Sequence, residues 1–118
     1  MLAEAKRQLT EYFALERTAF DLPLVLFGTP FQQQVWRALQ AIPYGTTVSY
    51  AAQAAMIGRP SAVRAVANAN AANPLSVIIP CHRVVLSAGL LGGYSGGVRR
   101  KAWLLALEGA SGGGGVKP

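Results

Sequence analysis

The chain has one cysteine and one histidine, Cys81 and His82, and they stand side by side in the stretch IIPCHRVV. A free thiol has a pKa of about 8.5, so only a few per cent is the reactive thiolate at neutral pH. A neighbouring imidazole or backbone N–H group can raise that fraction. Adjacent residues often point apart, so a contact between these two would be direct or through a water. They are either a nucleophile with its proton acceptor or a small buried hydrophobe beside a core histidine.

The composition indicates a single globular domain. The chain has 118 residues, 52% of them hydrophobic, and no apolar run approaches the roughly 20 residues that span a bilayer. A single cysteine excludes an internal disulfide, and with a single histidine there is no Cys/His cluster for structural zinc. We therefore expect an intracellular protein with no membrane segment, no metal and no cofactor.

Basic residues are concentrated in the second half of the chain, and the net charge is +6. Residues 1–58 hold four basic and four acidic groups, whereas residues 59–118 hold seven basic groups and a single acid, Glu108. Such a half suits a polyanion, with nucleic acid as the first candidate. A basic, soluble surface without a partner is the alternative.

Helical spacing and capping residues predict the first elements. A helix is expected over 2–15, with an apolar face made by Leu2, Ala5, Leu9 and Phe13. The run FDLPLVLFG at 20–28 suggests an edge strand because it contains a proline. A second helix is then expected to begin with a capping box of Thr29 and Gln32, to carry Pro30 in its first turn and to end before Pro43.

Two short helices are expected next, joined by a tight turn. Ser49 caps the first and Gly58 ends it, while Pro60 starts the second, which runs to about Asn70. Such a pair is a helix-turn-helix candidate, although similar pairs occur in plain bundles. The rest predicts a buried strand at 75–79, a glycine-rich loop or hairpin at 86–97, a helix at 98–108 ended by Gly109, and a flexible tail at 110–118.

The second helix of this pair has a surface of small residues, with Arg64 its only charge. Its alanines are Ala62, Ala65, Ala67, Ala69 and Ala71. Small side chains allow close approach of the backbone to another surface. That surface is either a neighbouring helix or a DNA groove, into which Arg64 would reach.

Longer stretches of the sequence favour a nucleophilic Cys81 and a DNA-binding helix. IPCHRV resembles the active-site signature of the O6-alkylguanine-DNA alkyltransferases (methylated-DNA–protein-cysteine methyltransferases). TPFQQQVWRALQAIPYGTTVSYAAQAA, GRPSAVRAVANANAANPLSVIIPCHRVV and GGYSGGVRRKAWLLALEG follow in that family's order and spacing. The resemblance covers 28–109 and implies the family's C-terminal catalytic and DNA-binding domain, a mainly α fold of helix-turn-helix or winged-helix-like type with short strands. Residues 1–27 resemble a remnant of the family's N-terminal domain with a linker.

The resemblance implies a single-use reaction at Cys81. In this family the cysteine takes the alkyl group from O6 of guanine and keeps it. His82 would be the base, acting through a water, and Glu108 would orient it. Asn73 would brace the turn and support the water network. Arg83 would be structural, tying the turn to neighbouring backbone.

A further group of residues is implied in base binding, because a stacked base must be flipped out to react. Arg64 would fill the space left in the stack. Tyr50 would help to rotate the 3′ phosphate and protonate N3, and Tyr94 would stack on the guanine. The backbone N–H of Ser95 would face O6, while the carbonyls of Cys81 and Val84 would accept from the exocyclic amine. Gly96, with Gly97, would widen the pocket lip enough for benzyl-type adducts.

The implied partner is double-stranded DNA carrying O6-alkylguanine, bound by a monomer through the minor groove. Ala65, Ala67 and Asn68 would lie on the groove-binding helix, where readout is degenerate. Asn68, Ala71 and Ala72 depart from the Gly- and Arg-containing pattern of the family and imply weaker DNA binding. The location would be cytoplasmic in a bacterium and nuclear in a eukaryote.

Two other functions remain open. Alkyltransferase-like proteins keep this fold without the nucleophilic cysteine and bind lesions without reacting, and the intact PCHRV argues against that class. A helix-turn-helix regulator would be a dimer with polar, base-reading side chains, and the alanines argue against it.

Overall fold

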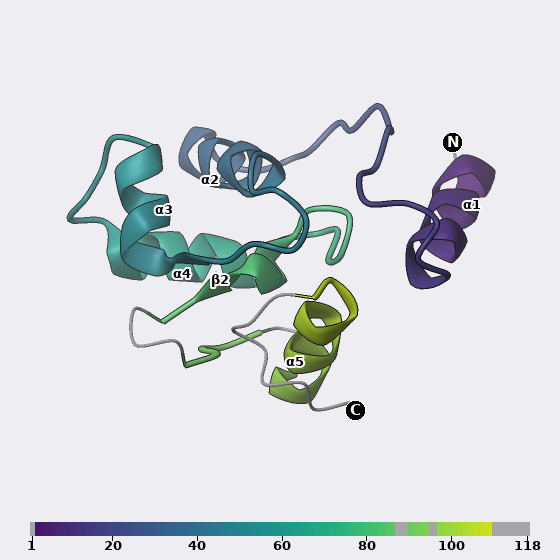
Figure 1. The fold of residues 1–118 in the computed structure, drawn as a ribbon. Coiled ribbons are helices and arrows are strands. Elements are labelled where there is room, and N and C mark those ends of the chain that lie inside the picture. The colour runs from purple at the N-terminus through teal and green to yellow at the C-terminus, as the bar shows by residue number, and fades with distance from the viewer. Residues whose placement is uncertain (1, 87–89, 95–96, 110–118) are drawn as a thin grey trace.

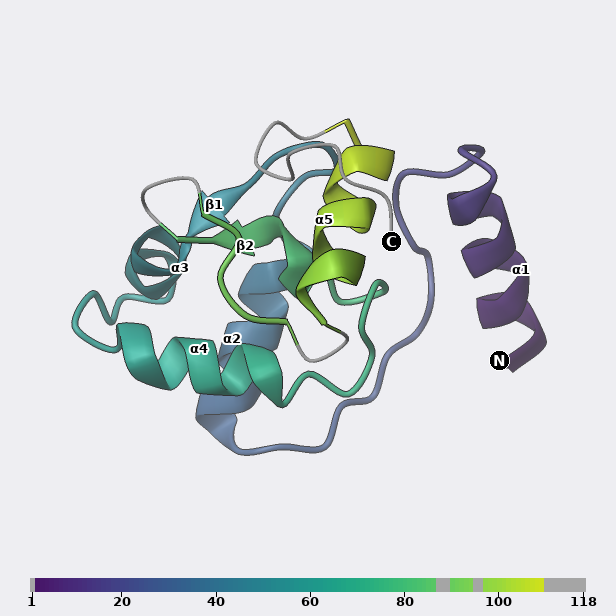
Figure 2. The same cartoon turned by 90° about the horizontal axis from the view of Figure 1, so that it is seen from below.

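The computed structural model describes residues 2–86, 90–94 and 97–109, so Ser95, Gly96 and the predicted tail at 110–118 lie outside it. The elements are α1 (Leu2–Phe13), α2 (Pro30–Gln40), β1 (Val48–Ser49), α3 (Tyr50–Met56), α4 (Val63–Ala71), the 3₁₀ helix η1 (Cys81–Arg83), β2 (Val84–Val85) and α5 (Val98–Leu107). Helices α2, α3 and α4 pack together, α5 lies beside η1, and α1 stands at the edge (Figures 1 and 2). The predicted mainly α fold with short strands is confirmed.

Helix α2 begins with the predicted capping box. The Thr29 hydroxyl accepts from the Gln32 N–H, and the Thr29 N–H donates to the Gln32 side chain, both at 3.0 Å. Pro30 lies in the first turn, where a missing N–H costs nothing. The helix ends at Gln40, ahead of Pro43. Its inner face buries Val35, Trp36 and Leu39, so this locally specified helix supplies the centre of the core.

Helices α3 and α4 form the predicted pair and are fixed to each other by two buried amides. Ser49 caps α3, and Gly58 turns the chain out of it with a φ of +74°. Between the helices, Gln53 and Asn70 exchange hydrogen bonds of 2.9 and 2.8 Å. Each amide satisfies the other, which removes the cost of burying either one.

The start of α4 differs from the prediction. Pro60 was expected to begin the helix, but it begins at Val63. The Ala62 N–H instead donates to the Arg59 carbonyl at 2.9 Å and closes a turn over the intervening residues. Pro60 therefore lies in this turn, where its fixed φ is equally well accommodated.

The strand predictions at 20–28 and 75–79 are both wrong. In the first segment the Asp21 N–H and carbonyl bond to the Gln8 side chain at 2.8 and 2.9 Å, and Pro23 has no N–H to pair. In the second, Val77 has a φ of +76° and the chain turns, leaving a single bridge between Ser76 and Ile79.

The sheet of the described residues is instead a parallel pair that the sequence did not predict. Val48 pairs with Val84 and Ser49 with Val85. Two residues per strand carry too little pattern to be recognised locally. The pair joins the start of α3 directly to the end of η1, so it sets the distance between the helix-turn-helix and Cys81.

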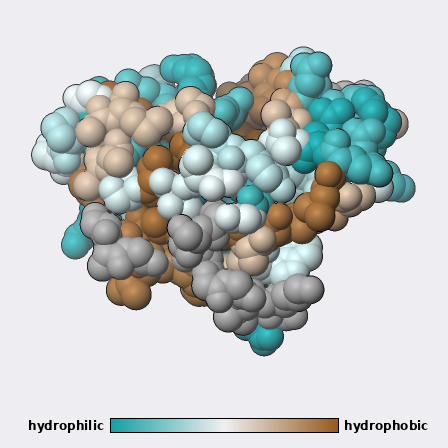
Figure 3. Space-filling model, in the orientation of Figure 1, coloured by the Kyte–Doolittle hydropathy of each residue, from teal (hydrophilic) through white to brown (hydrophobic). Residues whose placement is uncertain are grey.

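The predicted apolar face of α1 is only partly buried, since Ala5 and Leu9 are half-buried. Gln8 and Tyr12 are buried, whereas Leu2 is 84% and Phe13 43% exposed. The outer side of α1 is hydrophilic (Figure 3), where Arg7 pairs with Glu4 and Glu11. Polar contacts of Gln8 thus contribute to how this helix lies. No helix among the described residues is long and apolar enough to cross a membrane.

We expect Thr29→Ala to destabilise the protein by about 1 kcal/mol, because it removes the hydroxyl that accepts the Gln32 N–H. Thr29→Ser keeps that acceptor and should unfold at nearly the parent's urea midpoint. Equal losses in the two variants, measured by circular dichroism, would show that the cap contributes nothing.

Candidate active site

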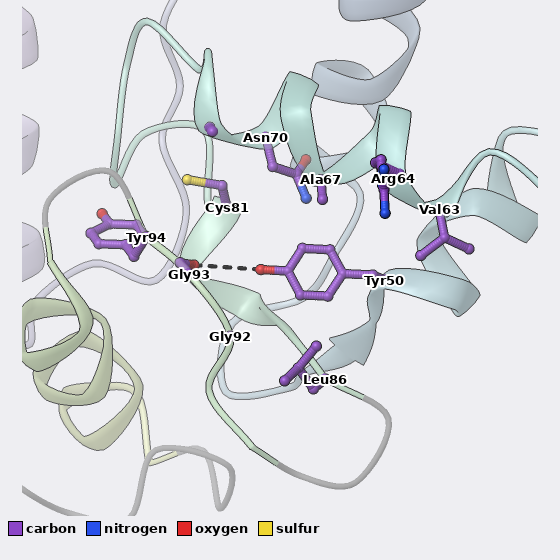
Figure 4. Close-up of a pocket in the computed structure, with 11 residues that line it drawn as sticks. Tyr50, Val63, Arg64, Ala67, Asn70, Cys81, Leu86, Gly92, Gly93 and Tyr94 are labelled. Atoms are coloured by element: carbon purple, nitrogen blue, oxygen red, sulfur yellow. Dashed lines mark hydrogen bonds between the residues drawn. The ribbon is translucent and has the colours of Figure 1, made fainter.

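A cavity of about 690 Å³ opens between the helix-turn-helix and the chain that leads to α5. Its lining residues are Tyr50, Val63, Arg64, Ala67, Asn70, Ala71, Cys81, Leu86, Gly92, Gly93 and Tyr94. Figure 4 shows Tyr50 and Tyr94 on either side, with Cys81 between them. A mostly apolar cavity of this size suits a small planar ligand held between two aromatic side chains.

Cys81 begins η1 at the wall of this cavity. Its N–H donates to the Ile79 carbonyl at 2.8 Å, and its carbonyl accepts from the Val84 N–H, so the backbone around the thiol is fixed. The side chain is 6% exposed. Burial raises the pKa of the Cys81 thiol, although Asn73 and Lys101 act in the opposite direction. The resting thiol is therefore protonated at neutral pH, and its chemistry needs a base.

His82 is a fully buried base held by a carboxylate. Its Nε2 lies 2.8 Å from Glu108 Oε2. Since the carboxylate can only accept, Nε2 carries the proton and Nδ1 is the basic nitrogen. Nδ1 has no hydrogen-bond partner among the described residues. Burial lowers the pKa of His82, outweighing the hydrogen bond to Glu108, so Nδ1 is free to accept a proton at neutral pH.

Glu108 is held by an ion pair as well as by His82. Arg83 donates from Nε to Oε1 and from Nη2 to Oε2, both at 2.9 Å, while its Nη1 donates to the Ile42 carbonyl at 2.7 Å. Burial opposes ionisation of Glu108, but hydrogen bonds from His82 and Arg83 hold its pKa at about 2. The structural role expected for Arg83 thus includes a charged partner that the sequence did not indicate.

Asn73 braces the turn before the cysteine. Its Nδ2 donates to the Ile79 carbonyl at 2.7 Å, and its Oδ1 accepts from the Leu75 N–H at 2.9 Å. Both bonds hold the segment that ends at Cys81, and the amide also lowers the pKa of the thiol. Asn73 therefore holds the turn before Cys81, while its support of a water network stays a prediction.

Lys101 is a site residue that sequence reasoning missed. It is fully buried, and its Nζ donates to the Gly93 carbonyl at 3.0 Å and to the Tyr50 hydroxyl at 3.4 Å. Burial lowers the pKa of Lys101 to about 8. Lys101 stands seven positions before Glu108 in the predicted last helix, which places the two on one face. That spacing could have identified it.

The two aromatic walls of the cavity, Tyr50 and Tyr94, both carry a hydroxyl group. The Tyr50 hydroxyl donates to the Gly93 carbonyl at 3.4 Å, as Figure 4 shows. Burial raises the pKa of Tyr94 to about 12, so its ring carries a neutral hydroxyl. Val84 is buried in β2, next to η1. The roles expected for Ser95 and Gly96 fall on residues that the structure does not describe.

Helix α4 presents three of its four expected groove-binding residues to solvent. Arg64, Ala65 and Asn68 are exposed, whereas Ala67 is half-buried against the cavity. Arg64 also lines the cavity mouth, so one side chain connects the outer face of α4 with the pocket. Within the described residues no cluster of His, Cys, Asp and Glu side chains could hold a metal ion.

The family model described as "6-O-methylguanine DNA methyltransferase, DNA binding domain" matches residues 30–110. The chain belongs to this family. The matched residues run from α2 through α5 and include every cavity residue named above, while α1 lies outside them.

Curated relatives extend the match. The constitutive methylated-DNA–protein-cysteine methyltransferase of Bacillus subtilis is 56% identical over 108 residues, which are 91% of this chain and 66% of that protein. The methylated-DNA–protein-cysteine methyltransferase of Mycobacterium tuberculosis H37Rv is 56% identical over 101 residues, which are 86% of this chain and 61% of that protein. The chain thus spans slightly less than two thirds of these relatives.

Solved structures of the family have the same fold. Mycobacterium tuberculosis OGT in complex with DNA superposes with a TM-score of 0.89 at 51% identity, over 93% of this chain and 70% of that one. Schizosaccharomyces pombe Atl1 in complex with damaged DNA containing O6-carboxymethylguanine gives a TM-score of 0.62 at 30% identity, over 71% of this chain and 80% of that one.

Glu108→Gln should destabilise the protein by about 3 kcal/mol or more at pH 7, because it leaves the buried Arg83 without its counter-charge. The pKa of Glu108 lies below its ordinary value of 4.5, so the stabilisation is present above pH 4.5 and is lost as the pH falls towards 2. The difference in the free energy of unfolding between parent and variant, measured in urea, should therefore become smaller as the pH falls over that range. Glu16→Gln, at an exposed position, is the control; a difference independent of pH would contradict the assignment.

Proposed function

We propose that residues 28–109 are the catalytic and DNA-binding part of a methylated-DNA–protein-cysteine methyltransferase that repairs O6-alkylguanine by direct transfer. The observation that carries the proposal is the position of Cys81: it faces the cavity and directly precedes a buried His82–Glu108 pair. The relatives' names and the family match support the same activity. The chain has the nucleophile, base and orienting acid that such a reaction needs.

In the proposed reaction, Nδ1 of His82 takes the Cys81 proton through a bridging water. The Sγ then attacks the alkyl carbon, the bond between that carbon and O6 breaks, and the bonding electrons pass to the guanine. Tyr50 donates a proton to N3 of the leaving base and is reprotonated from the imidazolium. The products are guanine and an S-alkyl cysteine. The alkyl group stays on the sulfur, because the cysteine thiolate is a poor leaving group from a thioether, so each chain reacts once.

Entry of the base requires flipping, because Cys81 lies inside a cavity and is only 6% exposed. We assign the outer face of α4 to the minor groove, since Arg64, Ala65 and Asn68 stand exposed there. Arg64 would occupy the gap in the stack, and Tyr94 would cover one face of the guanine. A monomer on double-stranded DNA suffices, as all these groups come from one chain.

Non-reactive lesion binding is the second candidate, because the fold also matches Atl1 in complex with DNA containing O6-carboxymethylguanine. Cys81 separates the two functions. A lesion binder has no need of a thiol beside a buried imidazole and carboxylate, whereas transfer requires all three.

Incubation with a duplex containing one O6-methylguanine should add one methyl group to each chain and then stop. Intact-mass spectrometry detects the addition, and Cys81→Ser should show none while still binding the duplex. Because the chain has a single cysteine, the modified residue is unambiguous. Lesion-selective binding by the parent without any mass gain would assign the chain to the lesion binders.

Arg64→Ala should lower the rate of transfer from duplex DNA by roughly ten- to a hundredfold, because unstacking a base costs a few kcal/mol and Arg64 would offset part of that cost. Transfer from free O6-benzylguanine, which is already unstacked, should keep the parental rate. Arg37→Ala, on α2, is the control for lost charge. Equal loss with both substrates would place Arg64 in the chemistry rather than in flipping.

A further inference from the structure

A buried hydrogen bond joins the first helix to the candidate catalytic carboxylate. The Tyr12 hydroxyl of α1 donates to Glu108 Oε2 at 2.5 Å, across 96 positions of sequence. Both residues are buried, and Tyr12 is 0% exposed. Helix α1 lies outside the residues that the family model matches, yet it reaches the same oxygen that binds His82.

Aromatic contacts fix the position of this hydroxyl. The Tyr12 ring lies 5.4 Å from Phe20 and 6.1 Å, edge to face, from Tyr44. A neighbouring contact stacks Phe13 on Trp103 of α5 at 5.8 Å. Tyr12 and Phe13 are therefore both held by aromatic contacts in the arrangement in which the Tyr12 hydroxyl reaches Glu108.

Glu108 Oε2 accepts from three donors, which are His82 Nε2, Arg83 Nη2 and the Tyr12 hydroxyl. Each donor withdraws negative charge from the oxygen that stabilises a protonated His82. Burial, and then the bond to Glu108, raises the pKa of Tyr12 far above its usual value, so its hydroxyl remains a donor at every working pH.

We propose that Tyr12 is a positioning residue for alkyl transfer: its hydroxyl fixes the Glu108 carboxylate and weakens its hold on the His82 proton, so that α1 helps to keep Nδ1 an unprotonated base. The inference rests on the proposed function, because Tyr12 acts only through the His82–Glu108 pair.

The charged groups around His82 determine in which direction the Tyr12 hydroxyl changes the pKa of the imidazole. The titratable and charged groups around the imidazole and its carboxylate are Tyr12, Tyr44, Cys81, Arg83, Lys101 and Glu108. Glu108 favours protonation of His82, whereas burial, Arg83 and Lys101 oppose it. Removing the Tyr12 hydroxyl leaves more negative charge for His82, so its pKa should rise.

The test compares Tyr12→Phe with Tyr44→Phe in the full chain. Both variants keep a ring in the aromatic contacts, but only the first removes a donor to Glu108; the Tyr44 hydroxyl donates to the Leu107 carbonyl at 3.4 Å. The chain has one histidine, so NMR of isotope-labelled imidazole follows His82 alone between pH 4 and 9. Tyr12→Phe should raise the titration midpoint by roughly half to one pH unit, and Tyr44→Phe should leave it unchanged.

Transfer from a duplex with O6-methylguanine supplies the second readout. The acid limb of the pH–rate profile should move upward in Tyr12→Phe by the same amount, with little change at the plateau. Identical His82 titrations in the parent, Tyr12→Phe and Tyr44→Phe would overturn the proposal. The same holds if the imidazole stays neutral over the whole pH range in all three proteins. An equal shift in Tyr44→Phe would overturn it as well. A further outcome is a higher His82 titration midpoint in Tyr12→Phe alone, together with no methyl transfer by the parent protein. That result would overturn the proposed function and the role of Tyr12 in transfer, while the coupling between Tyr12 and His82 would stand.

Discussion

A buried negative charge must be surrounded by hydrogen-bond donors, and the buried carboxylate of Glu108 imposes this requirement on the segments around it. Its two oxygens receive hydrogen bonds from η1 through His82 and Arg83, and from α1 through Tyr12. Glu108 itself is the C-cap residue that follows α5. Three segments far apart in sequence therefore converge on one group, and none can move without leaving a buried polar atom unpaired. The rigidity of the turn that carries Cys81 follows from this convergence, and so does the orientation of the imidazole.

Local chemistry explains which elements the sequence could predict. The capping box of α2, the Ser49 cap and the glycine turn after α3 depend on residues within a few positions of one another, and all three are present in the structure. The strand predictions were wrong because a strand needs a partner. The backbone of Asp21 is paired by the Gln8 side chain, and Val77 turns the chain instead of extending it. The true partners, β1 and β2, are two residues long, too short to show a pattern.

The residues of the candidate site also fall into those that the sequence could predict and those that it could not. The Cys81–His82 pair is visible in the sequence, and a family resemblance adds Asn73, Tyr50, Tyr94 and Glu108; the structure brings these residues together around one cavity and its adjoining buried pair. Tyr12 was missed because its hydroxyl acquires its partner from 96 positions away. Lys101 was missed because a lysine in an amphipathic helix is usually exposed, although its spacing from Glu108 was visible. The thiol is held protonated and the imidazole neutral. A protonated thiol beside a neutral imidazole must lose its proton before the sulfur can act as a nucleophile.

The reciprocal amides of Gln53 and Asn70 bear on how this fold can diverge. Sliding α3 along α4 by one position would separate them and leave their polar atoms unpaired in an apolar interface, so the pair admits a single register. Asn70 also lines the cavity, so that register fixes where the outer face of α4 stands relative to the sulfur. A substitution at either position is tolerable only with a matching one at the other. Across the family, these two positions should therefore co-vary.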